Sequence, residues 1–258
     1  MSQVTQKKSS HTHAGNSLSR RRFLQLSAAG VAATLGTAGF DLSPAAAAAV
    51  EARRQTGTLR VAWEIPATLN PLTASSDTEI SFLNAIYDYL IDTDANSQLI
   101  PRLAESWEIN DDGLTYTLKL RDGVKFHDGS DLTPEDVLWT FDYHRAAEGT
   151  VAGLLSNVTG IEAGDGNTVV FTLSQPNPDF LYSLTDNKTV ILKKDTVPQN
   201  SDGTYNTEGA FEIGFDFIGT GPFVLDEILA GFDRAVLTAN ADYWGGAPGI
   251  ETLEFIYF

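Results

Sequence analysis

Hydrophobic and polar positions alternate over several short stretches of this chain, and that alternation has the period of a β-strand with one buried face. The clearest case is residues 114–120, LTYTLKL, where the alternation holds at every position. An Asn-Asp-Asp-Gly turn precedes it, which predicts a hairpin with the strand before. The pattern predicts seven strands: Thr58–Trp63, Pro101–Trp107, Leu114–Leu120, Thr168–Leu173, Val224–Ile228, Arg234–Ala239 and Glu251–Phe258.

Other stretches have helical spacing. Apolar residues recur every three or four positions in Glu79–Leu90, and Asp77 or Thr78 is the expected N-cap. Thr133–Asp136 begins a second helix, with Thr at the N-cap, Pro at the first helical position and two acids near the positive end of the helix dipole. A third helix is expected over Asp179–Leu184. Strands and helices follow one another irregularly, so the fold class is α/β or α+β.

The first fifty residues have a composition of their own. Three consecutive arginines, Arg20 to Arg22, precede the uncharged and Ala/Gly-rich segment Leu24–Phe40, and the small residues Ala45–Ala49 follow. A basic region, an apolar region and a small-residue exit make a secretory signal, which we expect to be cleaved between Ala45 and Ala49. The alternative is an uncut membrane anchor, but 17 residues of this composition are short and weakly apolar for a span.

The arginines also suggest the export route. Arg20, Arg21, Phe23 and Leu24 stand in the sequence SRRRFLQ, which resembles the twin-arginine export motif. That route transports folded proteins, so the mature domain is expected to need no disulfide. The chain has no cysteine, which agrees with this expectation and excludes a Cys-anchored lipoprotein.

The net charge of the chain limits the kinds of molecule that it is expected to bind. The chain has 17 basic and 34 acidic residues in 258. Without the five basic residues and one acid of the first fifty, 12 basic and 33 acidic residues remain, a net charge of −21. Nucleic acid is therefore not an expected partner, because a phosphate-binding face needs a basic patch. The surplus of acids over lysines also suggests a salty habitat.

The search for catalytic or metal-binding chemistry finds little, and no cofactor is predicted. The segment starting at Asp92 resembles a calcium loop but has Leu103 where a bidentate Glu is required. His127 and His144 have no matching acid and serine nearby, so a turn-stabilising role is expected for His127. Glu135 and Asp136 are helix neighbours whose side chains point apart. The sequence gives no catalytic residue.

Aromatic residues could instead line a ligand cleft. Trp107 and Trp139 lie on apolar faces and are expected in the core. Trp63, at the end of the first predicted strand, could serve either role.

Longer motifs resemble a known family. The sequences PRLAESWE (101–108), DDGLTYTLKLRDGVKFHDG (111–129) and LTPEDV (132–137) resemble the signature of extracytoplasmic solute-binding proteins of family 5, the oligopeptide/dipeptide-binding components of ABC importers. TLNP (68–71), GTGPF (219–223) and NADYWGG (240–246) resemble other landmarks of the family. Together these motifs span roughly residues 58–258.

The resemblance implies an α/β fold, the first lobe of a type II (cluster C) clamshell like that of periplasmic binding proteins. A mixed sheet would form from residues 50–90 and 184–258, with 91–183 as an inserted subdomain and 1–49 as the twin-arginine signal peptide. Family members are about twice as long as this chain, so the second lobe is expected to be missing. The chain alone is then expected not to close around a ligand.

The resemblance also implies a function and a site. The expected function is to capture a small solute, such as a peptide, in the periplasm or elsewhere outside the cytoplasm and to deliver it to an ABC permease in the membrane. The loop after the first strand would face the cleft, which places Ser75 and Asp77 nearest the ligand. A solvated loop with Asp77 as helix cap is the alternative for these residues. A secreted hydrolase and a partner-binding lobe without transport remain alternatives for the function, and the ligand could be a peptide, an opine, a nickel complex or a sugar.

Overall fold

The computed structural model describes residues 55–145, 151–197, 216–229 and 233–258, and the structural statements below concern these residues. They belong to one compact unit that extends from Ala49 to Phe258. The expected export signal, with Arg20, Arg21, Phe23 and Leu24, lies outside the described residues, as does most of the polar stretch after residue 197.

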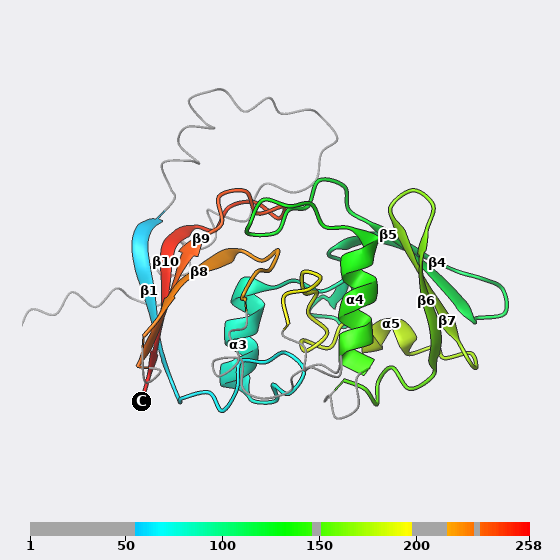
Figure 1. Ribbon diagram of the computed structural model, residues 1–258, viewed down its shortest axis with the longest axis horizontal. Helices are drawn as coiled ribbons and strands as arrows, with labels where there is room; N and C mark the ends of the chain where they lie inside the picture. The colour runs from blue at the N-terminus through cyan, green and yellow to red at the C-terminus, as the bar shows by residue number, and fades with distance from the viewer. Residues whose placement is uncertain (1–54, 146–150, 198–215, 230–232) are drawn as a thin grey trace, which may run out of the picture. The chain divides into compact units, whose positions relative to one another are not determined.

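The first and last strands of this unit lie side by side in one mixed sheet (Figure 1). Its order is β1-β10-β9-β8, in which β1 is parallel to β10 and the other neighbours are antiparallel. The strands are β1 (Gln55–Trp63), β8 (Phe223–Ile228), β9 (Arg234–Ala239) and β10 (Ile250–Tyr257).

One face of this mixed sheet is covered by helix α3 (Asp77–Ile86). Alternate residues of β10, Leu253 and Phe255 among them, are buried on that face because the side chains of a strand alternate between its two faces. Phe82 of α3 packs edge-on against Phe255, with ring centroids 5.8 Å apart. The amphipathic pattern of both elements therefore buries one continuous core.

A second sheet is antiparallel throughout, with the order β4-β5-β7-β6 (Figure 1). The strands are β4 (Ala104–Ile109), β5 (Thr115–Leu120), β6 (Val158–Gly164) and β7 (Thr168–Leu173). A short hairpin of β2 (Ile91–Thr93) and β3 (Leu99–Pro101) precedes it. The short helix α5 (Phe180–Ser183) packs on this sheet, with the Phe180 ring 4.8 Å from that of Tyr116.

Helix α4 (Pro134–Arg145) contributes to both cores. Val137 and Phe141, one turn apart, belong to the core of the antiparallel sheet. Trp139 and Tyr143 belong to the core between α3 and the mixed sheet, and their rings stack with centroids 5.9 Å apart. The helix therefore lies between the two sheets and joins their cores.

Several predicted elements are confirmed, among them β7 and β9 with the bounds expected from the sequence. Gly113, Gly123 and Gly129 all have positive φ angles, as tight turns require. The expected core position of Trp139 is confirmed, and Trp107 packs partly buried against the other core.

Other expectations were wrong. The N-cap of α3 is Ser76, not Asp77 or Thr78, and the helix ends at Ile86 rather than Leu90 because Tyr87 is extended. The strand expected over Pro101–Trp107 divides into the end of β3 and the start of β4. Strand β6 was not expected from the sequence.

Candidate ligand-binding site

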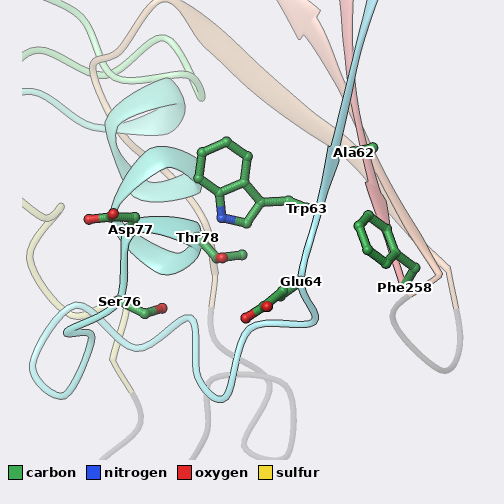
Figure 2. Close-up of a pocket in the computed structure, with 7 residues that line it drawn as sticks. All are labelled: Ala62, Trp63, Glu64, Ser76, Asp77, Thr78 and Phe258. Atoms are coloured by element: carbon green, nitrogen blue, oxygen red, sulfur yellow. The ribbon is translucent and has the colours of Figure 1, made fainter.

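An open pocket of about 420 Å³ lies where β1 ends and α3 begins (Figure 2). The carboxyl ends of the parallel strands β1 and β10 meet at this edge of the mixed sheet. In α/β sheets this is the edge at which ligands bind, because loops rather than continuing strands form the surface there. The pocket is lined by Ala62, Trp63, Glu64, Ser76, Asp77, Thr78 and Phe258.

The loop between β1 and α3 is held in place by the carboxylate of Glu79. Its Oε1 accepts hydrogen bonds from the backbone N–H groups of Ala67 and Thr68, both at 3.1 Å. Its Oε2 accepts from those of Ser75 and Ser76, at 2.7 and 2.9 Å. Ser76 in turn caps the Glu79 N–H, which completes a capping box. A single buried side chain thus fixes both ends of the loop and the first turn of the helix.

Burial of Glu79 opposes its ionisation, but the hydrogen bonds from Ser75, Ser76 and Thr68 outweigh that effect and lower its pKa below 4.5. The carboxylate therefore stays ionised at neutral pH, as an acceptor of four N–H groups should.

The aromatic wall of the pocket comes from the ends of the paired strands. Trp63 is half-buried against the core of α3 and the mixed sheet, and Figure 2 shows its indole ring pointing from β1 toward the helix. Trp63 faces Tyr257 in the strand register, and its carbonyl accepts a hydrogen bond of 3.1 Å from the Phe258 N–H. Phe258 itself is 77% exposed.

The two residues predicted to lie nearest the ligand have different surroundings. Asp77 is exposed and lines the pocket, whereas Ser75 is exposed on the loop just before it and is not among the lining residues. Asp77 is not the helix cap, so the alternative structural role expected for it belongs to Ser76. Ligand contact by Ser75 and Asp77 stays a prediction.

Sequence reasoning did not assign Glu64, Thr78 or Phe258 to a binding site, and it left the role of Trp63 open. One signal was present, since Trp63 and Glu64 come directly at the end of a predicted strand. The position of Phe258 could not be read locally, because it depends on a parallel pairing between the two ends of the described chain.

The histidines have structural roles. The ring of His127 accepts a hydrogen bond at Nδ1 from the Gly219 N–H (3.3 Å), so its Nε2–H donates to the Gly221 carbonyl (3.1 Å). Burial lowers the pKa of His127, which favours the neutral ring that this arrangement needs. The turn-stabilising role expected for His127 was wrong in its partners, because the ring binds Gly219 and Gly221, 92 and 94 residues away, rather than groups of its own turn. His144 is buried, with Nε2 3.1 Å from the Val190 carbonyl.

Within the described ranges, no group of three or more His, Asp or Glu side chains could hold a metal ion. Asp92 lies in β2, and the turn to β3 follows from Asp94, whose side chain accepts hydrogen bonds from the Asn96 and Gln98 N–H groups. Residues 94–98 are all exposed, so this part of the segment is a solvated turn. None of the helices in this part of the chain is long and apolar enough to cross a membrane.

Comparison with known proteins identifies the family. Residues 98–258 match the family model described as "Bacterial extracellular solute-binding proteins, family 5 Middle". The chain belongs to this family. Family 5 membership confirms the resemblance on which the expected fold was based.

Individual proteins that the chain resembles also support this family assignment. The chain is 32% identical over 214 residues to the dipeptide-binding protein of Escherichia coli K12, and the match covers 74% of this chain and 38% of that protein. Among solved structures, it is similar to the oligopeptide-binding protein AppA from Bacillus subtilis in complex with a nonapeptide, with 29% identity and a TM-score of 0.65. That match covers 79% of this chain and 40% of AppA.

A second solved structure, NikA from Brucella suis in complex with Fe(III)-EDTA, has 26% identity and a TM-score of 0.67, and the match covers 78% of this chain and 39% of NikA. The described residues therefore have the mixed α/β fold of family 5 periplasmic binding proteins. The chain spans about two fifths of the length of the relatives it matches.

Proposed function

We propose that this chain is the first lobe of the substrate-binding component of an ABC importer, which captures a small solute outside the cytoplasm and delivers it to a membrane permease. The observation that supports this most directly is the pocket at the carboxyl ends of β1 and β10 in a chain of family 5. Relatives in this family are transport binding proteins rather than enzymes, as the name of the dipeptide-binding protein illustrates.

The division of the chain follows from the same proposal. Residues 50–90 and 184–258 would form the sheet subdomain of the lobe, and residues 91–183 the inserted subdomain. The pairing of β1 with β10 and the separate antiparallel sheet of β4 to β7 support this division. The match covers 38% of the dipeptide-binding protein, and we expect the second lobe, which would close over the pocket, to lie in the unmatched part.

A peptide is the solute we favour, because a dipeptide-binding protein and a protein crystallised with a nonapeptide are among its relatives. NikA, with Fe(III)-EDTA, shows that family membership alone leaves the ligand class open. The lobe on its own should bind weakly, since one wall of a cleft buries less of a ligand than two.

The binding test is an NMR titration of the isotopically labelled chain with a mixture of short peptides. Weak binding should shift the backbone signals of residues 63, 64 and 76–78 and the indole N–H of Trp63. The small apolar hollow at Ala241 and Pro248 serves as the internal control and should not respond. Shifts confined to sites other than the β1–α3 pocket would contradict the proposed function, and tight binding by the chain alone would contradict the need for a second lobe.

Export would use the twin-arginine route, with residues 1–49 as a signal removed on the outer side of the membrane. The sequence around Arg20, Arg21, Phe23 and Leu24 supports this proposal. Changing Arg20 and Arg21 together to Lys should leave the precursor in the cytoplasm, as measured by cell fractionation. Changing Lys7 and Lys8 to Gln, outside the motif, should leave export intact. Normal export of the double arginine variant would exclude the route.

A further inference from the structure

We infer that residues 190–194 form a strap that opens in acid and then separates α4 from the core of α3 and the mixed sheet. Figure 1 shows this segment, in yellow, between α3 and α4. The inference goes beyond the proposed function, because it concerns a conformational change of the lobe and its test needs no solute. The proposed location outside the cytoplasm would expose the strap to the pH of the surroundings.

Three side chains of α4, spaced four residues apart, hold the strap by its backbone. They are Asp136, Thr140 and His144, and their backbone partners are those of Lys194, Leu192 and Val190 in that order. Each donor–acceptor distance is 3.0 or 3.1 Å, and the Thr140 hydroxyl both accepts from the N–H and donates to the carbonyl of its partner. Four helical residues rise about 6 Å and two extended residues span about 6.6 Å, so the two repeats match.

The strap also connects the two hydrophobic cores. Val190 and Leu192 belong to the core of α3 and the mixed sheet, whereas Ile191 belongs to the core of the antiparallel sheet. All three are fully buried, and the Ile191 N–H donates to the Asp88 carbonyl, just beyond the end of α3, at 2.7 Å. A backbone this buried cannot exchange its partners for water, so the loss of one contact leaves an unpaired polar group.

His144 is the member of this set that acid can alter. Its side chain is fully buried, and the neutral ring carries its proton on Nε2 because the Val190 carbonyl can only accept. The other ring nitrogen, Nδ1, is buried and has no hydrogen-bond partner within the described residues. A proton added there would create a buried cationic N–H group without an acceptor, which is strongly unfavourable. The closed strap therefore requires neutral His144, whereas an open strap lets the ring ionise in water.

The surroundings of His144 compensate little for a positive charge. The charged group that acts on the ring from the neighbouring segment is Asp186, which lies 4.0 Å from the Lys188 ammonium. Helix α4 itself contributes the Tyr143 ring, and β6 and β7, which pack on α4, contribute apolar core residues such as Phe171. Burial outweighs the Val190 hydrogen bond and the charge of Asp186, and it lowers the pKa of His144 from 6.5 to about 4.

The sign of the pH dependence follows from this lowered pKa. The stability of the closed strap is complete above pH 6.5 and is lost as the pH falls toward 4, because only the open state binds the proton in this range. Opening should become about ten-fold more frequent for each pH unit, or about 300-fold over the whole range.

The test is hydrogen exchange of the full chain between pH 7 and pH 4, read by mass spectrometry and divided by the intrinsic exchange rate at each pH. The peptide covering residues 190–194 should show the 300-fold change. It should also exchange faster than the peptide covering β10 at every pH, because local opening requires less free energy than global unfolding. Equal protection of both peptides at every pH would mean that the strap opens only by global unfolding, and would overturn the inference.

Two variants identify the titrating group. His144→Gln can still donate to the Val190 carbonyl but does not titrate, so the change in strap opening between pH 6.5 and 4 should shrink from about 300-fold to less than about ten-fold. The matched control is His127→Gln, which removes the other imidazole of lowered pKa and should keep the full change. An undiminished change in His144→Gln, or its loss in His127→Gln, would contradict the role of His144.

A third variant tests whether the side chains of α4 hold the strap. Thr140→Val keeps the shape of the side chain and removes both hydrogen bonds to Leu192, so the strap should open at least about ten-fold more often at pH 7 and keep its pH dependence. The control is Asp142→Asn on the exposed side of the same helix, which should change neither. Parent-like exchange in a folded Thr140→Val would contradict the inference, and the two histidine variants decide it if this variant does not fold.

Discussion

The guanidinium of Arg102 lies against the fully buried carboxylate of Asp88, with Nη2 2.5 Å from Oδ1. Trp244 Nε1 and Thr220 Oγ1 donate to Oδ2 of the carboxylate. The Tyr243 hydroxyl donates to Oδ1, the oxygen that Arg102 contacts. Burial raises the pKa of Asp88, while Arg102, Trp244 and Tyr243 oppose that rise. The carboxylate thus connects the end of α3 to three segments that are distant in sequence.

We expect Asp88→Asn to lower the free energy of unfolding by about 3 kcal/mol, because it leaves a partly buried guanidinium without its counter-charge. Urea denaturation measures the change. The control is Asp131→Asn, which breaks the exposed ion pair with Lys125 and should cost at most about 0.5 kcal/mol. If the two variants lose equal stability, the buried pair is no more important than a surface pair.

Glu79→Gln should destabilise the chain by about 2 kcal/mol, because an amide has one acceptor oxygen where the carboxylate uses two and accepts four N–H groups. Since the pKa of Glu79 is lowered, this stabilisation is present above the unfolded value of 4.5 and is lost as the pH falls through the lower folded value. The difference between parent and variant should therefore shrink in acid. Glu135→Gln, at an exposed helix start, is the control, and a constant difference at all pH values would contradict the role of Glu79.

Gly219 and Gly221 pass very close to the end of α3. A Cβ at Gly219 would lie 2.1 Å from the Ile86 carbonyl oxygen, and one at Gly221 would lie 2.5 Å from it. The contacted atoms belong to the backbone of Ile86, which cannot move away as a flexible side chain could. Alanine at either position should therefore lower the free energy of unfolding by more than about 3 kcal/mol. Gly249→Ala, with open space around it, is the control and should change the stability by less than about 1 kcal/mol. Normal thermal stability of Gly219→Ala would contradict this packing.

The free energy of unfolding should already fall as the pH is lowered from 6.5 toward 4, because His144 is buried in its neutral form. Burial lowers the pKa of His144 from 6.5 to about 4, so the folded state binds fewer protons than the unfolded state between these values. The stability due to neutral His144 is complete above pH 6.5 and is lost as the pH falls toward 4, by about 3 kcal/mol in all.

His144→Gln can still donate to the Val190 carbonyl but does not titrate. Its free energy of unfolding, measured by urea denaturation from pH 7 to 4, should fall less steeply than that of the parent chain. His127 also has a lowered pKa, so part of the pH dependence should remain. Equal slopes for parent and variant would show that His144 is not protonated on unfolding in this range.

Local patterns predicted much of the fold because they are short-range properties. The bounds of β7 and β9 follow from alternation, and the start of α4 follows from Thr133 and Pro134. β6 was missed because VTGIEAG contains two glycines and no regular alternation. The N-cap of α3 was misplaced by one or two residues, because Ser76, Asp77 and Thr78 are all residue types that cap helices well. Ser76 is the cap because Glu79 stands three residues after it and completes the capping box.

The sequence by itself determined the family, because the motifs between residues 101 and 137 fix turns and strands by local chemistry. Only the tertiary structure decided the pocket. Trp63 and Phe258 are 195 positions apart, and they meet because β1 pairs in parallel with β10, a contact that no local pattern specifies. Likewise, Thr78 is an ordinary helix-start residue in the sequence. Only the packing of α3 against the end of β1 places it, 7% exposed, in the wall of the pocket.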